Sequence, residues 1–67
     1  MRSGNFVELE LIVKGLSQHE LINVEHISRI LFVEGTPYIG MLGSTYTRQI
    51  SKVSFDMLVK HLNISDL

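Results

Sequence analysis

The most constraining pattern in this chain is the alternation of side-chain types from Phe6 to Lys14. Every second position is apolar, which is the period of a β-strand with one buried face. That face carries Val7, Leu9, Leu11 and Val13. The opposite face has carboxylates in its middle and apolar side chains near both ends, namely Phe6, Glu8, Glu10 and Ile12. A face of this kind is more apolar than contact with water requires, so we expect that both sides of the strand need cover.

The middle of the chain predicts further extended segments. Gly15 ends the first strand, residues 16–19 are interpreted as a loop, and residues 20–23 as a short extended piece. A tight turn at residues 24–26 then leads into a strand at residues 27–34. Both faces of that strand are largely apolar, which is typical of a central strand covered on two sides.

Two hairpins are predicted next. Residues 34–37 contain the glycine and the proline that suit a turn and the start of a strand. Residues 38–42 and 45–50 are rich in Tyr, Thr and Ile, which favours strands, and a turn at residues 43–44 joins them. Gly40 lies inside the first of these two strands, where glycine marks a β-bulge or a close neighbour.

The hydrophobic period changes from two to that of a helix near the C-terminus. Ser54 is a suitable cap for a helix that ends at Leu62, with Asp56 in its first turn. The apolar stripe of this helix consists of Phe55, Leu58, Val59 and Leu62. The predicted fold class is therefore α+β, a small antiparallel sheet of four to five strands with one C-terminal helix packed on one face. We expect residues 1–67 to form a single domain.

The chain is short for an independently stable domain, and it has no cysteine. A domain of this length buries roughly 60% of the surface that its unfolded chain exposes, so its stability is usually small. Disulfides, a structural metal or a partner subunit usually supply the difference. The absence of cysteine excludes disulfides and thiolate metal sites, and it fits a reducing compartment. We therefore expect a homo-oligomer.

The charge balance and the N-terminal residues limit the classes of partner. Six basic and seven acidic side chains give a net charge of -1, whereas nucleic-acid binders commonly carry a basic stripe. Glu8 and Glu10 interrupt the first apolar run, so no secretory h-region is predicted, and no segment approaches the length of a membrane span. We expect a cytoplasmic protein.

The polar residues do not form a recognisable catalytic or metal-binding motif. His19 and His26 lack the spacing of a helical zinc pair, and no cysteine completes a set of ligands. Ser51 and Ser54 lack a G-x-S-x-G setting, and charges on one strand face are commonly those that keep a strand soluble. We therefore expect no catalytic residue, no metal and no cofactor, and a protein that is not an enzyme.

The surplus of apolar side chains on both sheet faces is the feature that points to function. One helix covers only one face, so the remainder predicts contacts with a partner through the second face or an exposed strand edge. The candidate interface residues are Phe6, Ile12, Ile30, Phe32, Ile39 and Met41.

Two alternatives use other residues. A nucleic-acid-binding sheet face would combine stacking rings with cations, at Arg29, Tyr38, Tyr46, Arg48 and Lys52. A ligand-binding or enzymatic site formed between subunits would lie around His19, Glu25 and His26.

Part of the sequence resembles a known family. The segment at residues 15–27 begins with glycine and ends in ELINVEHI, which is similar to the "G, then E-I-x-I-N-P-D-H-I" segment of FlbD-type flagellar and swarming-motility proteins. Gly43, the strand at residues 46–50 and the helix start from Ser54 to Leu58 resemble the closing segment of that family. The resemblance implies a small accessory regulator that acts through protein contacts, and it carries over no catalytic residue.

The order of the predicted elements also resembles the core of LytTR DNA-binding domains, in which a strand like the one predicted at residues 27–34 precedes a hairpin and a final helix. This likeness is one of fold alone. The predicted function is that of a non-enzymatic regulatory protein that binds other proteins as an oligomer, either an accessory regulator or a phage or mobile-element inhibitor of a host factor.

Overall fold

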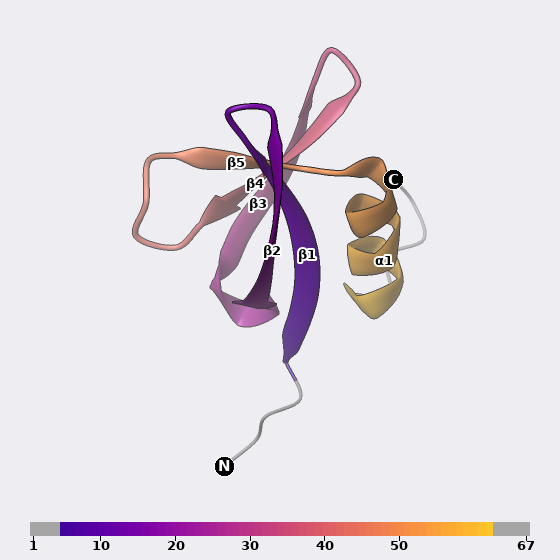
Figure 1. The fold of residues 1–67 in the computed structure, drawn as a ribbon. Coiled ribbons are helices and arrows are strands. Elements are labelled where there is room, and N and C mark those ends of the chain that lie inside the picture. Colours follow the sequence, from indigo (N-terminus) through magenta and orange to yellow (C-terminus); the bar gives the residue numbers. More distant parts are fainter. Residues whose placement is uncertain (1–4, 63–67) are drawn as a thin grey trace.

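A computed structural model describes residues 5–62 of the chain and shows the predicted α+β fold (Figure 1). Five strands form one antiparallel sheet, and a single helix packs on one of its faces. The elements are β1 (Phe6–Val13), β2 (Leu16–Asn23), the 3-10 helix η1 (Val24–His26), β3 (Ile27–Val33), β4 (Thr36–Met41), β5 (Thr47–Ile50) and α1 (Lys52–Leu62). Within the described part of the chain, no helix is long and apolar enough to cross a bilayer.

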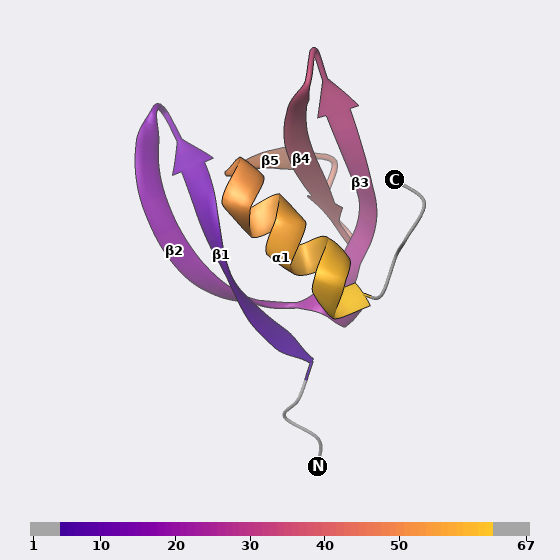
Figure 2. The same ribbon diagram turned by 90° about the vertical axis from the view of Figure 1, so that its right-hand side faces the viewer.

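The strand order in the sheet is β2-β1-β5-β4-β3. Every pair of strands that follow each other in the chain is hydrogen-bonded except β2 and β3, and β5 closes the path by pairing with β1. The β1–β2 and β3–β4 hairpins therefore lie on either side of α1 (Figure 2). β2 and β3 form the two edges of the sheet, so the prediction that residues 27–34 form a central strand is wrong.

Two turns of the same kind build these hairpins. Lys14 and Gly15 have φ angles of 52° and 79°, and Glu34 and Gly35 have φ angles of 52° and 82°. Two consecutive residues with positive φ are the requirement of the two-residue type I′ turn, which matches the twist of the flanking strands. The first turn sends the chain directly into β2, so the loop predicted at residues 16–19 is wrong.

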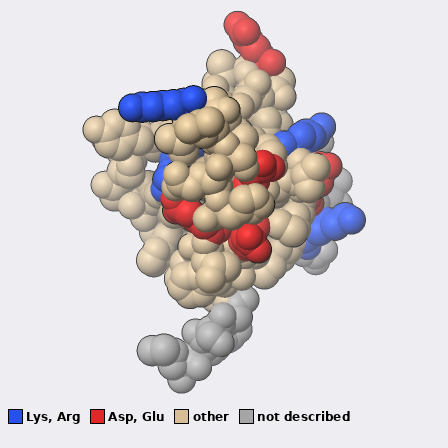
Figure 3. Space-filling view, in the orientation of Figure 1, with Lys and Arg blue, Asp and Glu red and all other residues tan. Residues whose placement is uncertain are grey.

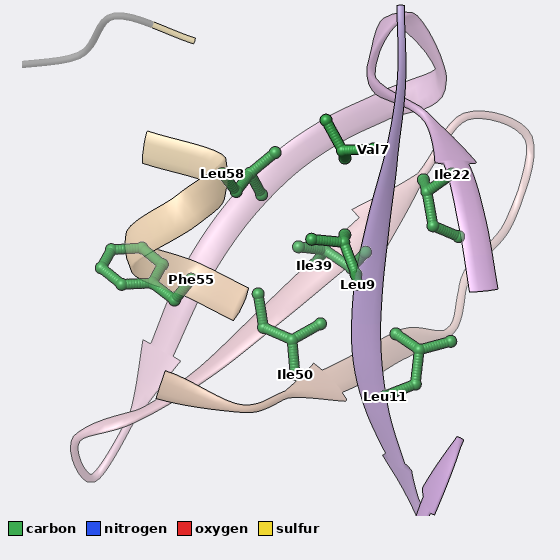
Figure 4. Close-up of a cluster of buried hydrophobic side chains, with 8 residues drawn as sticks. All are labelled: Val7, Leu9, Leu11, Ile22, Ile39, Ile50, Phe55 and Leu58. Carbon is green, nitrogen blue, oxygen red and sulfur yellow. The ribbon is translucent and has the colours of Figure 1, made fainter. Parts of the chain in front are cut away.

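The core lies between α1 and one face of the curled sheet (Figure 4). Val7 pairs with Ile22 and Leu11 pairs with Ile50, which places the apolar side chains of three strands on the same face. The buried hydrophobic residues are Val7, Leu9, Leu11, Ile22, Ile39, Ile50, Phe55 and Leu58. The predicted stripe on the helix is confirmed, with Phe55 and Leu58 buried and Val59 and Leu62 packed partly against the core.

The start of α1 differs from its prediction. The Ser54 N–H donates to the Ser51 Oγ at 3.1 Å, so Ser51 caps the helix. Ser54 lies inside α1 and is buried, and its Oγ accepts a hydrogen bond from the Glu10 N–H of β1 at 2.7 Å. The Ser51 N–H in turn donates to the Glu10 carbonyl at 3.0 Å. The two serines thus connect the end of β5 to β1, and α1 starts earlier than predicted.

Gly40 has both properties that its place in a strand predicts. It pairs with Arg29, and the register of β3 shifts between Ile27 and Arg29, which is a β-bulge or a local irregularity. A Cβ atom on Gly40 would lie 2.9 Å from the Arg29 Cγ. The Arg29 side chain therefore lies directly over Gly40 on the face of the sheet opposite α1.

Candidate functional site

The surface of the described residues is rich in large apolar side chains. Eight hydrophobic residues form the core, whereas ten large hydrophobic residues are exposed. The exposed residues are Phe6, Val13, Leu16, Leu21, Phe32, Val33, Leu42, Tyr46, Val53 and Met57. Single exposed apolar residues are normal in soluble proteins, but adjacent ones mark interaction sites. The arrangement of these residues on the sheet therefore matters more than their number.

One group lies on the sheet face opposite α1, which we call the uncovered face. The β1 residues on this face are Phe6, Glu8, Glu10 and Ile12, and the β2 residues Ser17, His19 and Leu21 lie beside them. Phe6 is paired with Asn23 and Glu8 with Leu21, so Phe6 and Leu21 are diagonal neighbours. Leu21 is 70% exposed and Phe6 is 51% exposed. Together they form an apolar patch beside two carboxylates.

A second group lies along β3, which is an edge of the sheet. The four residues Ile30–Val33 are all apolar, and we call them the β3 edge. Phe32 and Val33 are exposed, and Ile30 and Leu31 are half-buried. The other edge strand, β2, has a run of polar residues at positions 17–20. Edge strands are usually protected by charged residues or proline, and the β3 edge has neither.

A groove of about 480 Å³ lies beside the β3 edge, on the helix side of the sheet. Phe32, Phe55 and Val59 are the apolar residues that line it, and Lys52, Asp56 and Lys60 of α1 are the charged ones. The rings of Phe32 and Phe55 meet edge to face, with centroids 4.9 Å apart. The groove extends the apolar surface of the β3 edge onto the helix.

The polar residues of the uncovered face form an exposed cluster. His19 Nδ1 lies 3.1 Å from Glu8 Oε2, and the Ser17 hydroxyl donates to the Glu10 carboxylate. Glu8 and His19 are more than half exposed, and exposed pairs of this kind contribute little to stability. Within residues 5–62, no group of three or more side chains could hold a metal ion.

The hydrogen bond from Ser17 lowers the pKa of Glu10 from its ordinary value of 4.5, and the Ser51 side chain and the charge of His19 act in the same direction. The unfolded chain binds the Glu10 proton more tightly, so this carboxylate adds stability at neutral pH that is lost as the pH falls through its folded pKa. We expect the free energy of unfolding to fall as the pH decreases below 4.5, and to fall less in Glu10→Gln. Urea titrations at each pH measure this difference. Ser17→Ala keeps the carboxylate but removes its donor, and an undiminished pH dependence in that variant would contradict the assignment.

The residues proposed for a site between subunits have different neighbours. His19 contacts Glu8 on the uncovered face, whereas Glu25 accepts a hydrogen bond from the Asn5 side-chain amide. His26 lies in η1 and is exposed. Glu25 and His26 are neighbours in η1, but among the described residues no hydrogen bond or ion pair joins them to His19.

The residues proposed for nucleic-acid contacts divide among three places. Tyr38, Tyr46 and Arg48 line a groove of about 660 Å³ near β5, and Arg48 is paired with Glu20 at 3.1 Å. Arg29 lies over Gly40, and Lys52 belongs to the groove beside the β3 edge. In Figure 3, most of the visible Asp and Glu side chains lie across the middle of the molecule, and Lys and Arg lie toward its margins.

The predicted interface residues also differ in their surroundings. Phe6 and Phe32 are exposed, and Ile12, Ile30 and Met41 are half-buried. Ile39 is 0% exposed because β4 lies inside the sheet and this side chain points into the core, so its assignment to an interface is wrong. Sequence reasoning missed Leu21 and Val33. Leu21 was placed in a short extended piece at residues 20–23, whereas β2 runs from Leu16 to Asn23 and its side-chain period identifies the outer face.

No family model matches this chain, and no curated protein or solved structure is significantly similar to it. The resemblance to FlbD-type proteins therefore stays a prediction based on short segments. The function has to be inferred from the chemistry of the uncovered face, the β3 edge and the two grooves.

Proposed function

We propose that this chain is a small regulatory protein without catalytic activity of its own, which acts as an oligomer by binding another protein. The observation that carries the proposal is that more large apolar side chains are exposed than are buried in the core of the described residues. Burying apolar surface contributes about 25 cal/mol per Å². A partner that covers these side chains would therefore stabilise a chain whose own core is small.

The uncovered face supports a contact with a second kind of protein. Phe6 and Leu21 offer the apolar centre that interfaces use, and Glu8 and Glu10 supply a polar rim of negative charge. A complementary partner would present an apolar patch bordered by Lys or Arg. The resemblance to FlbD-type proteins is consistent with such an accessory role.

Affinity capture with matched variants tests this proposal. The immobilised full-length chain is exposed to extract from its native host, and Leu21→Lys is compared with Val53→Lys. Both variants place one lysine at a strongly exposed apolar site, but Val53 is 75% exposed on α1, away from the uncovered face. We expect the same protein to be retained by wild type and Val53→Lys and lost from Leu21→Lys, at low and high salt. Equal retention by all three chains, or no retention by wild type, would contradict the proposal.

Nucleic-acid binding is the second candidate, because Tyr38 and Tyr46 line the same groove as Arg48. The pairing of Arg48 with Glu20 disfavours a phosphate backbone, because it already neutralises this cation. Retention that disappears on nuclease treatment, or that weakens steeply with salt, would favour this candidate over the first.

A further inference from the structure

We propose that a second copy of this chain binds to the β3 edge, with the two β3 strands antiparallel about a two-fold axis, so that the two sheets become one. This inference rests on the oligomeric part of the proposed function and names the partner and the surface. The β3 edge is a different surface from the apolar patch that Phe6 and Leu21 form on the uncovered face. The two interactions can therefore be tested separately.

The backbone of β3 offers hydrogen-bonding groups at its open side. A two-residue turn is closed by a hydrogen-bonded pair, which here is Val33 with Thr36. Such pairs alternate along an antiparallel ladder, so Leu31 and Val33 bond to β4 while the N–H and C=O groups of Ile30 and Phe32 point outward. Within residues 5–62, no backbone group pairs with this side of β3, so the edge can accept another strand.

The side chains of β3 favour the same chain as its partner. With Leu31 on the two-fold axis, Ile30 of one copy lies opposite Phe32 of the other, and both are on the helix side of the sheet. On the other side of the sheet, Leu31 faces the partner's Leu31, so apolar side chains meet on both sides of the new strand pair. The grooves lined by Phe32 and Phe55 of the two copies meet over this pair, so the contact extends beyond the strands. A two-fold interface requires one patch that complements itself, and the β3 edge satisfies this condition.

The charges at the ends of β3 select the antiparallel arrangement. Arg29 precedes the β3 edge and Glu34 follows it, so one end is positive and the other negative. Antiparallel pairing about Leu31 places Arg29 opposite Val33 of the partner subunit, next to the partner's Glu34. Parallel pairing would place like charges together. Because the Arg29 side chain lies over Gly40, we expect Arg29 to attract the partner's Glu34 across a short distance without forming a direct ion pair.

The first test is the mass of the full-length chain in solution as a function of concentration. By sedimentation equilibrium, wild type should approach twice the single-chain mass of 7.6 kDa. Leu31→Lys would place two lysines against each other on the axis, and we expect dissociation to become at least about tenfold easier. Leu21→Lys makes the same change on the other edge strand and should leave the dimer unchanged. A single-chain mass at all concentrations, or a dimer weakened by Leu21→Lys and not by Leu31→Lys, would overturn the proposal.

Amide hydrogen exchange on wild type provides a second test that needs no variant. The Ile30 and Phe32 amides should exchange slowly in concentrated samples and quickly after dilution. The Leu31 and Val33 amides bond to β4 and should be protected in both. Fast exchange at Ile30 and Phe32 in the dimer would place the interface elsewhere. If self-pairing fails in these tests while Leu21→Lys still abolishes capture of a host protein, the pairing at the β3 edge is wrong and the binding of another protein through the uncovered face stands.

Discussion

Leu58→Ala is expected to lower the free energy of unfolding by about 3 kcal/mol, which lies within the range for leucine-to-alanine changes in a core. Leu58 is 0% exposed and lies on the inner face of α1, within the cluster that also contains Leu9 and Ile39. Alanine is the best helix former, so the loss comes from packing and not from the helix itself. The free energy of unfolding of a small domain is only a few kcal/mol. We therefore expect a substantial unfolded fraction in this variant even without denaturant.

Met57→Ala is the matched control, because Met57 is the preceding residue of the same helix and is 44% exposed. We expect it to cost less than about 1 kcal/mol, as surface substitutions usually do. Urea unfolding followed by circular dichroism measures both values under one condition. Both should be measured at low protein concentration, so that a coupled dimer does not contribute to the result. Similar costs for the two variants would mean that α1 is not held on the sheet by Leu58.

The elements with strong periodicity could be predicted from the sequence. β1 alternates over its whole length, and its predicted inner face contains Leu9 and Leu11, which are fully buried. The stripe of α1 was equally clear because helical spacing and burial agree at Phe55 and Leu58. In both elements a single pattern determines which side faces the core. The fold class followed from these two elements and the turns between them.

The sheet edges could not be predicted from the sequence. The polar residues of β2 resemble a loop because an edge strand has no need for alternation where both sides meet water. β3 resembles a central strand because it is apolar on both faces, but periodicity does not report strand order. A subunit pairing at this edge would give β3 the surroundings that its composition indicates.

The candidate site was predictable only in part for the same reason. Phe6 and Phe32 were identified because they belong to the surplus of apolar side chains on both sheet faces, and both are exposed. Ile39 was misassigned because only the pairing of β4 with β3 and β5 decides which of its side chains enter the core. Leu21 lies on a strand that was not expected to be continuous. The exposure of these side chains depends on the order of the strands in the sheet, and local sequence patterns do not determine that order.

The helix start shows a similar limit at the scale of single residues. Ser51 and Ser54 both precede or begin an amphipathic segment, and either could be its cap. The choice depends on Glu10, which is distant in sequence and offers its N–H to Ser54 and its carbonyl to the Ser51 N–H. The two hydroxyls therefore have different roles, which substitution can separate.

Ser54→Ala is expected to destabilise the protein by about 1–3 kcal/mol, because it leaves the Glu10 N–H of β1 without its partner beside a buried position. Ser51→Ala removes only the cap and should cost about 1 kcal/mol. Urea unfolding of the two variants measures which change destabilises the protein more. Hydrogen exchange locates the lost hydrogen bond, since the Glu10 amide should exchange faster in Ser54→Ala and remain protected in Ser51→Ala. If Ser51→Ala proved the more damaging change, or if the Glu10 amide were unaffected by Ser54→Ala, then the connection between α1 and β1 would not depend on the Ser54 hydroxyl.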